Sequence, residues 1–190
     1  MKTFEPSCMK TIGLIGGMSW ESSKLYYEAI NHHTKRLLGG NHSARCVMVS
    51  VDFADIERLT FQRRWDCIGD RMARSAMQLQ HAGADVVVLC TNTIHRVSHA
   101  ISRSIDIPFL HIAQTTAEAI KAQGLNKVAL LGTRFTMEED FYTSVLAIQH
   151  GLDVIIPPMY ERQEVHDIIY KELVKGKFTL KARQKVQHIM

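Results

Sequence analysis

The chain has 190 residues, of which 46% are hydrophobic and 22% are charged, an ordinary composition for a globular protein. Its formal charge of +4 comes from 23 basic and 19 acidic residues that are scattered along the sequence rather than gathered in blocks. This argues against a nucleic-acid-binding arm and against a membrane-binding patch. No apolar run has the length of a membrane span, and Met1–Met9 lacks the pattern of a secretory signal. The four cysteines show no CxxC spacing, so we predict reduced thiols in a soluble, cytoplasmic protein.

Short apolar runs alternate with amphipathic stretches from one end of the chain to the other. Several runs consist almost wholly of β-branched residues and leucine, which is typical of parallel strands covered on both faces. The predicted strands are Thr11–Ile15, Cys46–Val51, Asp85–Leu89, Ile107–Ile112, Lys127–Leu131 and Asp153–Ile156. The alternation predicts an α/β fold built from right-handed βαβ units with a parallel sheet flanked by helices.

The helices between these strands have recognisable ends. Ser19 can cap the first helix, which Gly39 ends. Thr136 and Glu139 have the spacing of a capping box at the start of a later helix. The remaining predicted helices begin at Trp65 and end before Gly83, run over Thr93–Arg103, Gln114–Gln123 and Glu161–Lys175, and begin at Thr179.

The sequence also contains a weak internal echo. Thr11–Gly17 and Lys127–Thr133 each read as a strand that runs into a turn of small residues and then a capped helix. We therefore predict two similar α/β lobes, residues 10–113 and residues 114–190, with an active site in the cleft between them. Ligands in such sheets bind beyond the carboxyl ends of the strands.

Cys90 is the sharpest candidate for chemistry. It ends a predicted strand, and Thr91 and Asn92 then open the next predicted helix. Amides at a helix start are expected to stabilise a thiolate and to lower a thiol pKa that begins near ~8.5. Thr91 and Asn92 could bind a carboxylate. The same position also fits a small buried cysteine at a strand end.

Other candidates follow the remaining strands. Met18 and Ser19 come after a glycine pair that allows close approach to a ligand, although no third glycine completes a dinucleotide fingerprint. Asp52 could meet a substrate ammonium or could cap a helix, and Arg58 lies just beyond it. Thr133 and Thr136 could extend hydroxyls toward the cleft or could serve as caps; we name them, with Met18, Ser19, Asp52 and Arg58, as candidate substrate-binding residues.

A metal site is not predicted. His95 and His99 are four residues apart, a spacing that could hold zinc, but no third ligand is evident.

The candidate motifs together resemble the aspartate/glutamate racemase family. They are Thr11-Ile-Gly-Leu-Ile-Gly-Gly-Met-Ser-Trp-Glu-Ser, Val88-Leu-Cys-Thr-Asn-Thr-Ile-His and Leu130-Leu-Gly-Thr-Arg-Phe-Thr-Met. The similarity runs from about Lys10 to the last residue and is closest to the broad-specificity amino-acid racemase branch.

The resemblance implies an isomerase that needs neither cofactor nor metal. Two cysteines on opposite faces of the substrate α-carbon act as acid and base, and Cys90 matches the first of them, with Thr91 and Asn92 on the α-carboxylate. The family is also expected to form homodimers. Its second cysteine lies in a Gly-Cys-Thr-Glu segment near the C-terminus, so we expect that thiol, and the rest of the second lobe, beyond Met190.

The resemblance also bears on the substrate. Family members that act on acidic amino acids have a lysine in a loop where this chain has Glu164. A carboxylate there would repel a second carboxylate, so we predict a small neutral or hydroxylated amino acid as substrate.

Three alternatives stay open. One is a single-cysteine enzyme of the same superfamily, of the decarboxylase or isomerase type. Another is a non-catalytic amino-acid-binding remnant. The last is a flavodoxin-like module that uses the glycine pair to bind a nucleotide.

Overall fold

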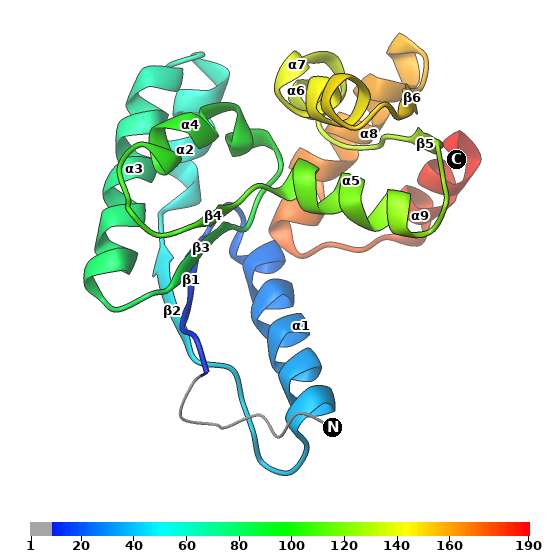
Figure 1. The fold of residues 1–190 in the computed structure, drawn as a ribbon. Coiled ribbons are helices and arrows are strands. Elements are labelled where there is room, and N and C mark those ends of the chain that lie inside the picture. The colour runs from blue at the N-terminus through cyan, green and yellow to red at the C-terminus, as the bar shows by residue number, and fades with distance from the viewer. Residues whose placement is uncertain (1–8) are drawn as a thin grey trace. The chain divides into compact units, whose positions relative to one another are not determined.

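The structure is a computed structural model that describes residues 9–190, so Cys8 lies outside the described residues. The chain divides into two compact units (Figure 1). The first holds the chain up to Thr91 together with Val97–Leu110, and the second holds Asn92–Arg96 together with His111–Met190. The break therefore falls three residues before the predicted one, and a short segment after Cys90 belongs to the second unit.

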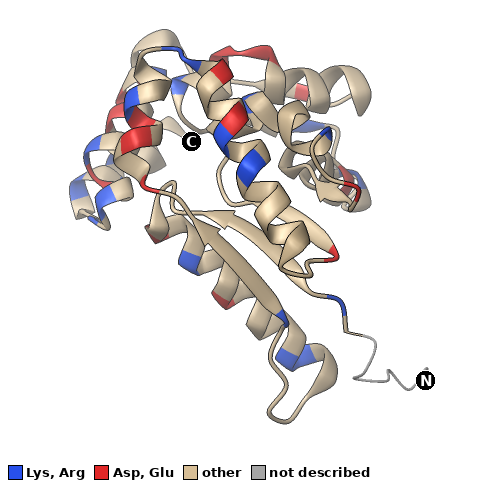
Figure 2. Cartoon of the chain, turned by 90° about the vertical axis from the view of Figure 1, so that its left-hand side faces the viewer, with Lys and Arg blue, Asp and Glu red and all other residues tan. Residues whose placement is uncertain are grey.

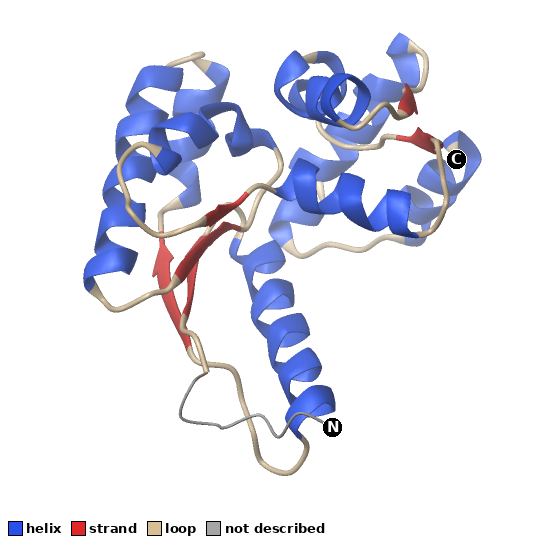
Figure 3. Cartoon of the chain, in the orientation of Figure 1, coloured by secondary structure: helices blue, strands red, loops and turns tan. Residues whose placement is uncertain are grey.

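The first unit is built on a four-stranded parallel sheet, and this confirms the predicted α/β fold (Figure 3). The strand order is β2-β1-β3-β4. The strands are β1 (Ile12–Gly16), β2 (Cys46–Ser50), β3 (Val86–Leu89) and β4 (Phe109–Leu110). All of them run in the same direction, so their carboxyl ends meet at one edge of the sheet.

Helices lie on both faces of this sheet (Figure 1). Helices α2 (Phe53–Phe61), α3 (Trp65–His81) and α4 (Ser98–Ser102) lie on one side, and α1 (Trp20–Leu38) lies on the other. Glycines in β1 permit the close packing on each face. A Cβ at Gly13 would lie 3.2 Å from the Leu79 Cβ of α3, and a Cβ at Gly16 would lie 2.9 Å from the Ser23 Oγ of α1.

The two faces are not covered equally. On the α3 face, Ile15, Val87 and Leu89 are at most 1% exposed. On the α1 face, Met48 is 39% exposed and Leu110 is 46% exposed. The hydrophobic core of the first unit therefore lies mainly between the sheet and α3.

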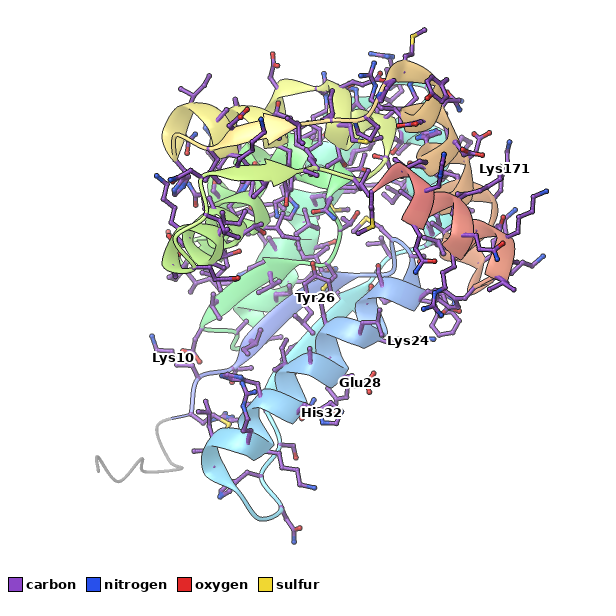
Figure 4. The ribbon with its side chains drawn as sticks, turned by 90° about the vertical axis from the view of Figure 1, so that its right-hand side faces the viewer. Lys10, Lys24, Tyr26, Glu28, His32 and Lys171 are labelled. Atoms are coloured by element: carbon purple, nitrogen blue, oxygen red, sulfur yellow. The ribbon has the colours of Figure 1, made fainter. Side chains whose placement is uncertain are left out.

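Helix α1 carries charge on its outer side. Lys24, Glu28 and His32 follow one another along that side (Figure 4), where Lys24 pairs with Glu21 and His32 pairs with Glu28. Exposed pairs of this kind contribute little to stability.

The second unit contains a two-stranded parallel sheet and a series of short helices. The strands are β5 (Lys127–Ala129) and β6 (Asp153–Ile155). The helices are η2 (Thr93–Val97), α5 (Ile112–Ala122), α6 (Arg134–Glu138), α7 (Asp140–Ser144), η3 (Val145–Gln149), α8 (Met159–Lys171), η4 (Leu173–Lys175) and α9 (Leu180–Ile189). A small core joins α5 to η3, with Ala117, Val145 and Leu146 buried in it.

Two predictions on the first sheet were wrong. The strand predicted at Ile107–Ile112 is only two residues long, because Pro108 has no N–H to donate and His111 already caps α5 by accepting a hydrogen bond from the Ala113 N–H. Helix α2 was not predicted at all. It begins directly after Asp52, which accepts a hydrogen bond from the Ala54 N–H at 3.1 Å and thus serves as its cap.

The helices of the second unit also differ from the prediction. The capping box at Thr136 and Glu139 does not form. Thr133 is the cap instead, since its Oγ1 accepts from the Thr136 N–H, and Glu139 follows the end of α6. The helix predicted at Thr93–Arg103 is split into η2 and α4, and that predicted at Glu161–Lys175 begins at Met159 and ends at Lys171.

Charged residues of both signs are interspersed on the helices and loops (Figure 2). The four strands of the first sheet carry none. Among the described residues, no helix combines the length and the apolar character needed to cross a membrane.

The tight turn after β1 requires a glycine at residue 17. Gly17 has a φ of +95°, and a Cβ there would lie 2.2 Å from the Val51 carbonyl oxygen. We expect Gly17→Ala to lower the free energy of unfolding by more than about 3 kcal/mol, because backbone strain adds to a clash with rigid backbone.

Gly83→Ala is the matched control for this variant. Gly83 also has a positive φ, +85°, but a Cβ there would meet nothing within 4 Å. Its loss should be about 1–2 kcal/mol in the same urea titration. Equal losses in the two variants would show that the contact with Val51 does not matter.

Candidate active site

Cys90 lies at the carboxyl end of β3, beside β1. Its backbone N–H donates to the Ile15 carbonyl at 2.9 Å, which continues the pairing of β1 with β3 by one residue. The Ser22 hydroxyl of α1 approaches the Cys90 carbonyl at 3.4 Å. The residue is completely buried. Its position is therefore fixed by two neighbouring elements of the first unit.

The predicted direction of the Cys90 pKa was wrong. Burial raises the pKa of the thiol to about 12. The helix expected to lower it begins only at Thr93 and is a 3-10 helix of five residues, so few aligned amides are available to stabilise a thiolate. The loss of hydration on burial destabilises the thiolate by more than these amides stabilise it. The raised pKa favours the neutral thiol over the thiolate.

The turn that contains Met18 and Ser19 lies next to Cys90 in the sheet, since it follows β1. Its backbone is held by α1: the Gly17 N–H donates to the Ser23 Oγ at 2.9 Å, and the Ser19 carbonyl accepts from the hydroxyls of Ser22 and Ser23. The amide of Gly17 is thus already used within the protein. Ser19 is the N-cap residue of α1, but its side chain makes no capping hydrogen bond.

Asp52 and Arg58 serve local structure. The Asp52 carboxylate caps α2, and Arg58 pairs with Asp55 at 2.9 Å. Arg71 also pairs with Asp55, and the hydrogen bonds from Arg58 and Arg71 lower the pKa of that carboxyl. These contacts give Asp52 the helix-capping role that the sequence left open, and they engage Arg58 in an ion pair.

A chain of hydroxyl groups forms in the second unit. Thr93 Oγ1 lies 2.8 Å from Thr133 Oγ1, which lies 3.2 Å from Thr136 Oγ1. Thr93 and Thr136 are buried. Asn92 precedes this chain and is exposed, and its carbonyl accepts from the His95 N–H at 3.0 Å. The structure thus brings Asn92, Thr133 and Thr136 near one another through Thr93, which the sequence did not single out.

His95 has a structural position. It is buried, its Nε2 accepts from the Ile112 N–H at 3.1 Å, and its ring meets the ring of His111 edge-on at 4.7 Å between centroids. Burial lowers the pKa of His111. No group of three metal-ligating side chains occurs in residues 9–190.

Glu164 lies in helix α8 and not in a loop. Its carboxylate pairs with Lys185 of α9. Together with Asp167, Lys171 and Lys181 these residues line a pocket of about 470 Å³ in the second unit. The charge of Glu164 is therefore partly compensated, which weakens the predicted repulsion of a substrate carboxylate.

A model of the Asp/Glu/hydantoin racemase family matches residues 15–190. The chain belongs to this family. The resemblance to the aspartate/glutamate racemases is thereby confirmed.

Relatives of known description agree with this assignment. The broad-specificity amino-acid racemase RacX of Bacillus subtilis is 24% identical over 152 residues, which are 76% of this chain and 63% of RacX. The chain thus spans less than two thirds of that relative. A crystal structure from Yersinia pestis, described as a candidate Asp/Glu racemase, is 46% identical with a TM-score of 0.86 over 95% of this chain and 79% of that one. An aspartate racemase homologue from Pyrococcus horikoshii is 33% identical with a TM-score of 0.73, over 89% of this chain and 74% of that one.

The buried thiol makes a prediction about labelling. Below its pKa, the thiolate fraction of Cys90 rises tenfold for each pH unit, and so should its rate of alkylation by iodoacetamide between about pH 8 and pH 10. We expect Cys67, which is partly exposed, to be labelled at least about tenfold faster at pH 8. Peptide mass spectrometry measures both rates. A Cys90 rate that levels off below pH 9 would contradict the raised pKa.

Proposed function

We propose that this protein is a cofactor-independent amino-acid racemase in which Cys90 is one of two acid/base thiols. The observation that carries the proposal is the fixed position of Cys90 at the carboxyl end of β3, directly beside the turn after β1. The family assignment supports the reaction type.

The raised pKa is compatible with this role. A thiolate that has lost its water is a stronger base than one in solution, and a weakly acidic α-proton requires a strong base. Ionisation of Cys90 then needs a compensating positive charge, which the ammonium group of the substrate would supply when it binds. In the reverse direction the neutral thiol already holds the proton that it must donate.

A racemase must remove a proton from one face of the α-carbon and return one to the other. Among the described cysteines, Cys46 begins β2 and so lies at the amino end of the sheet, while Cys67 lies in the first turn of α3 next to Arg64. Neither extends the carboxyl end of a strand as Cys90 does. The proposal therefore assigns the second thiol to a part of the whole protein outside the described residues, as the family resemblance implies.

The substrate contacts are also proposed. Thr91 and Asn92 would hold the α-carboxylate, with Met18 and Ser19 on the neighbouring turn. Thr133 and Thr136 would add hydroxyl groups from the second unit, and their hydrogen-bonded chain with Thr93 orients them in advance. Asp52 and Arg58 would have to give up their structural contacts in order to bind the substrate. The cleft between two lobes stays a prediction.

We propose a small neutral or hydroxylated amino acid as substrate and a cytoplasmic homodimer as the working form. Glu164 supports the first point, although its pairing with Lys185 reduces the effect. The exposed apolar side chains of the first unit, Met48 and Leu110 among them, leave surface that a second subunit could bury.

A single-cysteine decarboxylase or isomerase of the same family is the second candidate. Such an enzyme needs a single thiol, and Cys90 at the carboxyl end of β3 could supply it. Release of carbon dioxide from an aryl- or alkylmalonate, without exchange of amino-acid α-protons, would select this alternative.

Replacement of Cys90 tests the assignment most directly. Cys90→Ala should reduce racemisation by at least about 10³-fold, and with it the exchange in deuterated water of the enantiomer whose α-proton Cys90 removes, while the second thiol can still exchange the α-proton of the other enantiomer. The melting temperature should change by only a few degrees, because alanine keeps the apolar contacts of a small buried side chain. Cys67→Ala is the matched control and should keep full activity. Unchanged racemisation in Cys90→Ala would remove the residue from the mechanism.

Specificity is tested at the α8–α9 ion pair. We expect neutral amino acids to have a higher kcat/KM than aspartate or glutamate. Glu164→Gln leaves Lys185 without its partner, so the ratio of kcat/KM for aspartate to that for a neutral amino acid should rise about tenfold. Glu161→Gln removes another carboxylate of the same helix, one that accepts a hydrogen bond from the Tyr160 hydroxyl and does not line this pocket, and it should leave the ratio unchanged. If both variants shift the ratio equally, the general charge of α8 and not Glu164 sets the preference.

A further inference from the structure

Ser23 is the one buried residue of helix α1, and its side chain is polar. Its side chain is 2% exposed. The hydroxyl accepts a hydrogen bond from the Gly17 N–H at 2.9 Å and donates one to the Ser19 carbonyl at 3.0 Å. The hydroxyl therefore both accepts from and donates to the backbone of the turn that connects β1 to α1.

The sequence of this turn is adapted to that contact. Gly16 has no Cβ, and one there would lie 2.9 Å from the Ser23 Oγ. On the opposite side the Val51 N–H donates to the Gly16 carbonyl at 3.1 Å, and the Val51 carbonyl leaves no space for a side chain at Gly17. The turn is thus held between the end of β2 and the hydroxyl of Ser23.

The same turn is connected to Cys90. The carbonyl of Ile15, one residue before the turn, accepts from the Cys90 N–H at 2.9 Å. Ser22, the neighbour of Ser23, donates to the Ser19 carbonyl at 2.9 Å and approaches the Cys90 carbonyl at 3.4 Å. A shift of the turn would therefore move the backbone of Met18 and Ser19 relative to the thiol.

We infer that Ser23 is a positioning residue for substrate binding, which holds the Gly17–Ser19 backbone at a fixed distance from Cys90. The inference rests on the racemase function proposed above and adds a residue to it. Ser23 is buried behind the turn and acts through Gly17 and Ser19. Its loss should weaken the binding of the amino acid while Cys90 keeps its own contacts and its chemistry.

Ser75 supplies a matched control. It is 4% exposed in α3 of the same unit, and its hydroxyl donates to the carbonyl four residues earlier, at Arg71, as that of Ser23 does at Ser19. This hydrogen bond of Ser75 stays within its own helix. Ser23→Ala and Ser75→Ala therefore remove the same type of bond within a helix, but only the first removes the contact with the turn.

The test measures kcat and KM of both variants in the whole protein, with the amino acid that the unaltered enzyme uses best. Ser23→Ala should raise KM at least about tenfold, because the Gly17 N–H loses its partner and the turn shifts. Its kcat should stay within about threefold of the unaltered value. Ser75→Ala should change neither. An unchanged KM in Ser23→Ala, or an equal change in Ser75→Ala, would overturn the inference.

Hydrogen–deuterium exchange separates this inference from the proposed function. The amides of residues 17–19 should exchange faster in Ser23→Ala than in the unaltered protein or in Ser75→Ala. If the unaltered protein racemises no amino acid, the proposed function fails and exchange alone decides whether Ser23 holds the turn. If those amides exchange at an unchanged rate, Ser23 does not hold the turn and the inference fails, whatever the activity.

Discussion

The packing of the turn after β1 is the constraint on which the candidate site of the first unit depends. Two glycines there let the chain pass between the Val51 carbonyl and the hydroxyl of Ser23, at distances that exclude any Cβ. Because the turn cannot relax toward either side, the start of α1 is fixed as well, and with it Ser22 beside the Cys90 carbonyl. The alignment of the Cys90 thiol with the Gly17–Ser19 backbone thus follows from steric exclusion at two residues and from a hydroxyl that bonds to both ends of the turn.

Burial of Cys90 has opposite effects on its two chemical roles. Burial raises the pKa of the thiol to about 12, which disfavours the thiolate, the form that reacts with oxidants and alkylating agents. The same desolvation makes the thiolate a stronger base once it forms. A low pKa, as the sequence suggested, would give more thiolate but a weaker base. In the proposed mechanism, the ammonium group of a bound substrate would favour ionisation of Cys90 by lowering this pKa, and the thiolate would give up part of its basicity in return.

Much of the fold could be predicted from the sequence, because strand composition and helix ends are local signals. The parallel direction of the strands and the starts of α1, α3 and α9 follow from such patterns. Helix α2 was missed because it is short and begins at an aspartate that reads equally well as a strand end. The sign of the Cys90 pKa shift required the burial of the thiol, which depends on residues distant in the sequence. Ser23 and Thr93 also escaped detection: a serine inside a helix and a threonine beside a stronger candidate give no signal until their hydrogen-bond partners are known.

Glu164 shows why a single aligned position does not determine substrate charge. The sequence comparison sets its carboxylate against a lysine and infers repulsion of a dicarboxylate. In the folded second unit, Lys185 of α9 compensates that carboxylate, and further lysines and carboxylates line the same pocket. An ion pair at a surface of intermediate exposure presents little net charge to a ligand. The ligand charge that the pocket prefers then depends on whether a ligand displaces Glu164 or Lys185 from the pair. Lys185 therefore matters as much as Glu164 to the specificity proposed above, because the packing of α8 against α9 sets the net charge of this pocket.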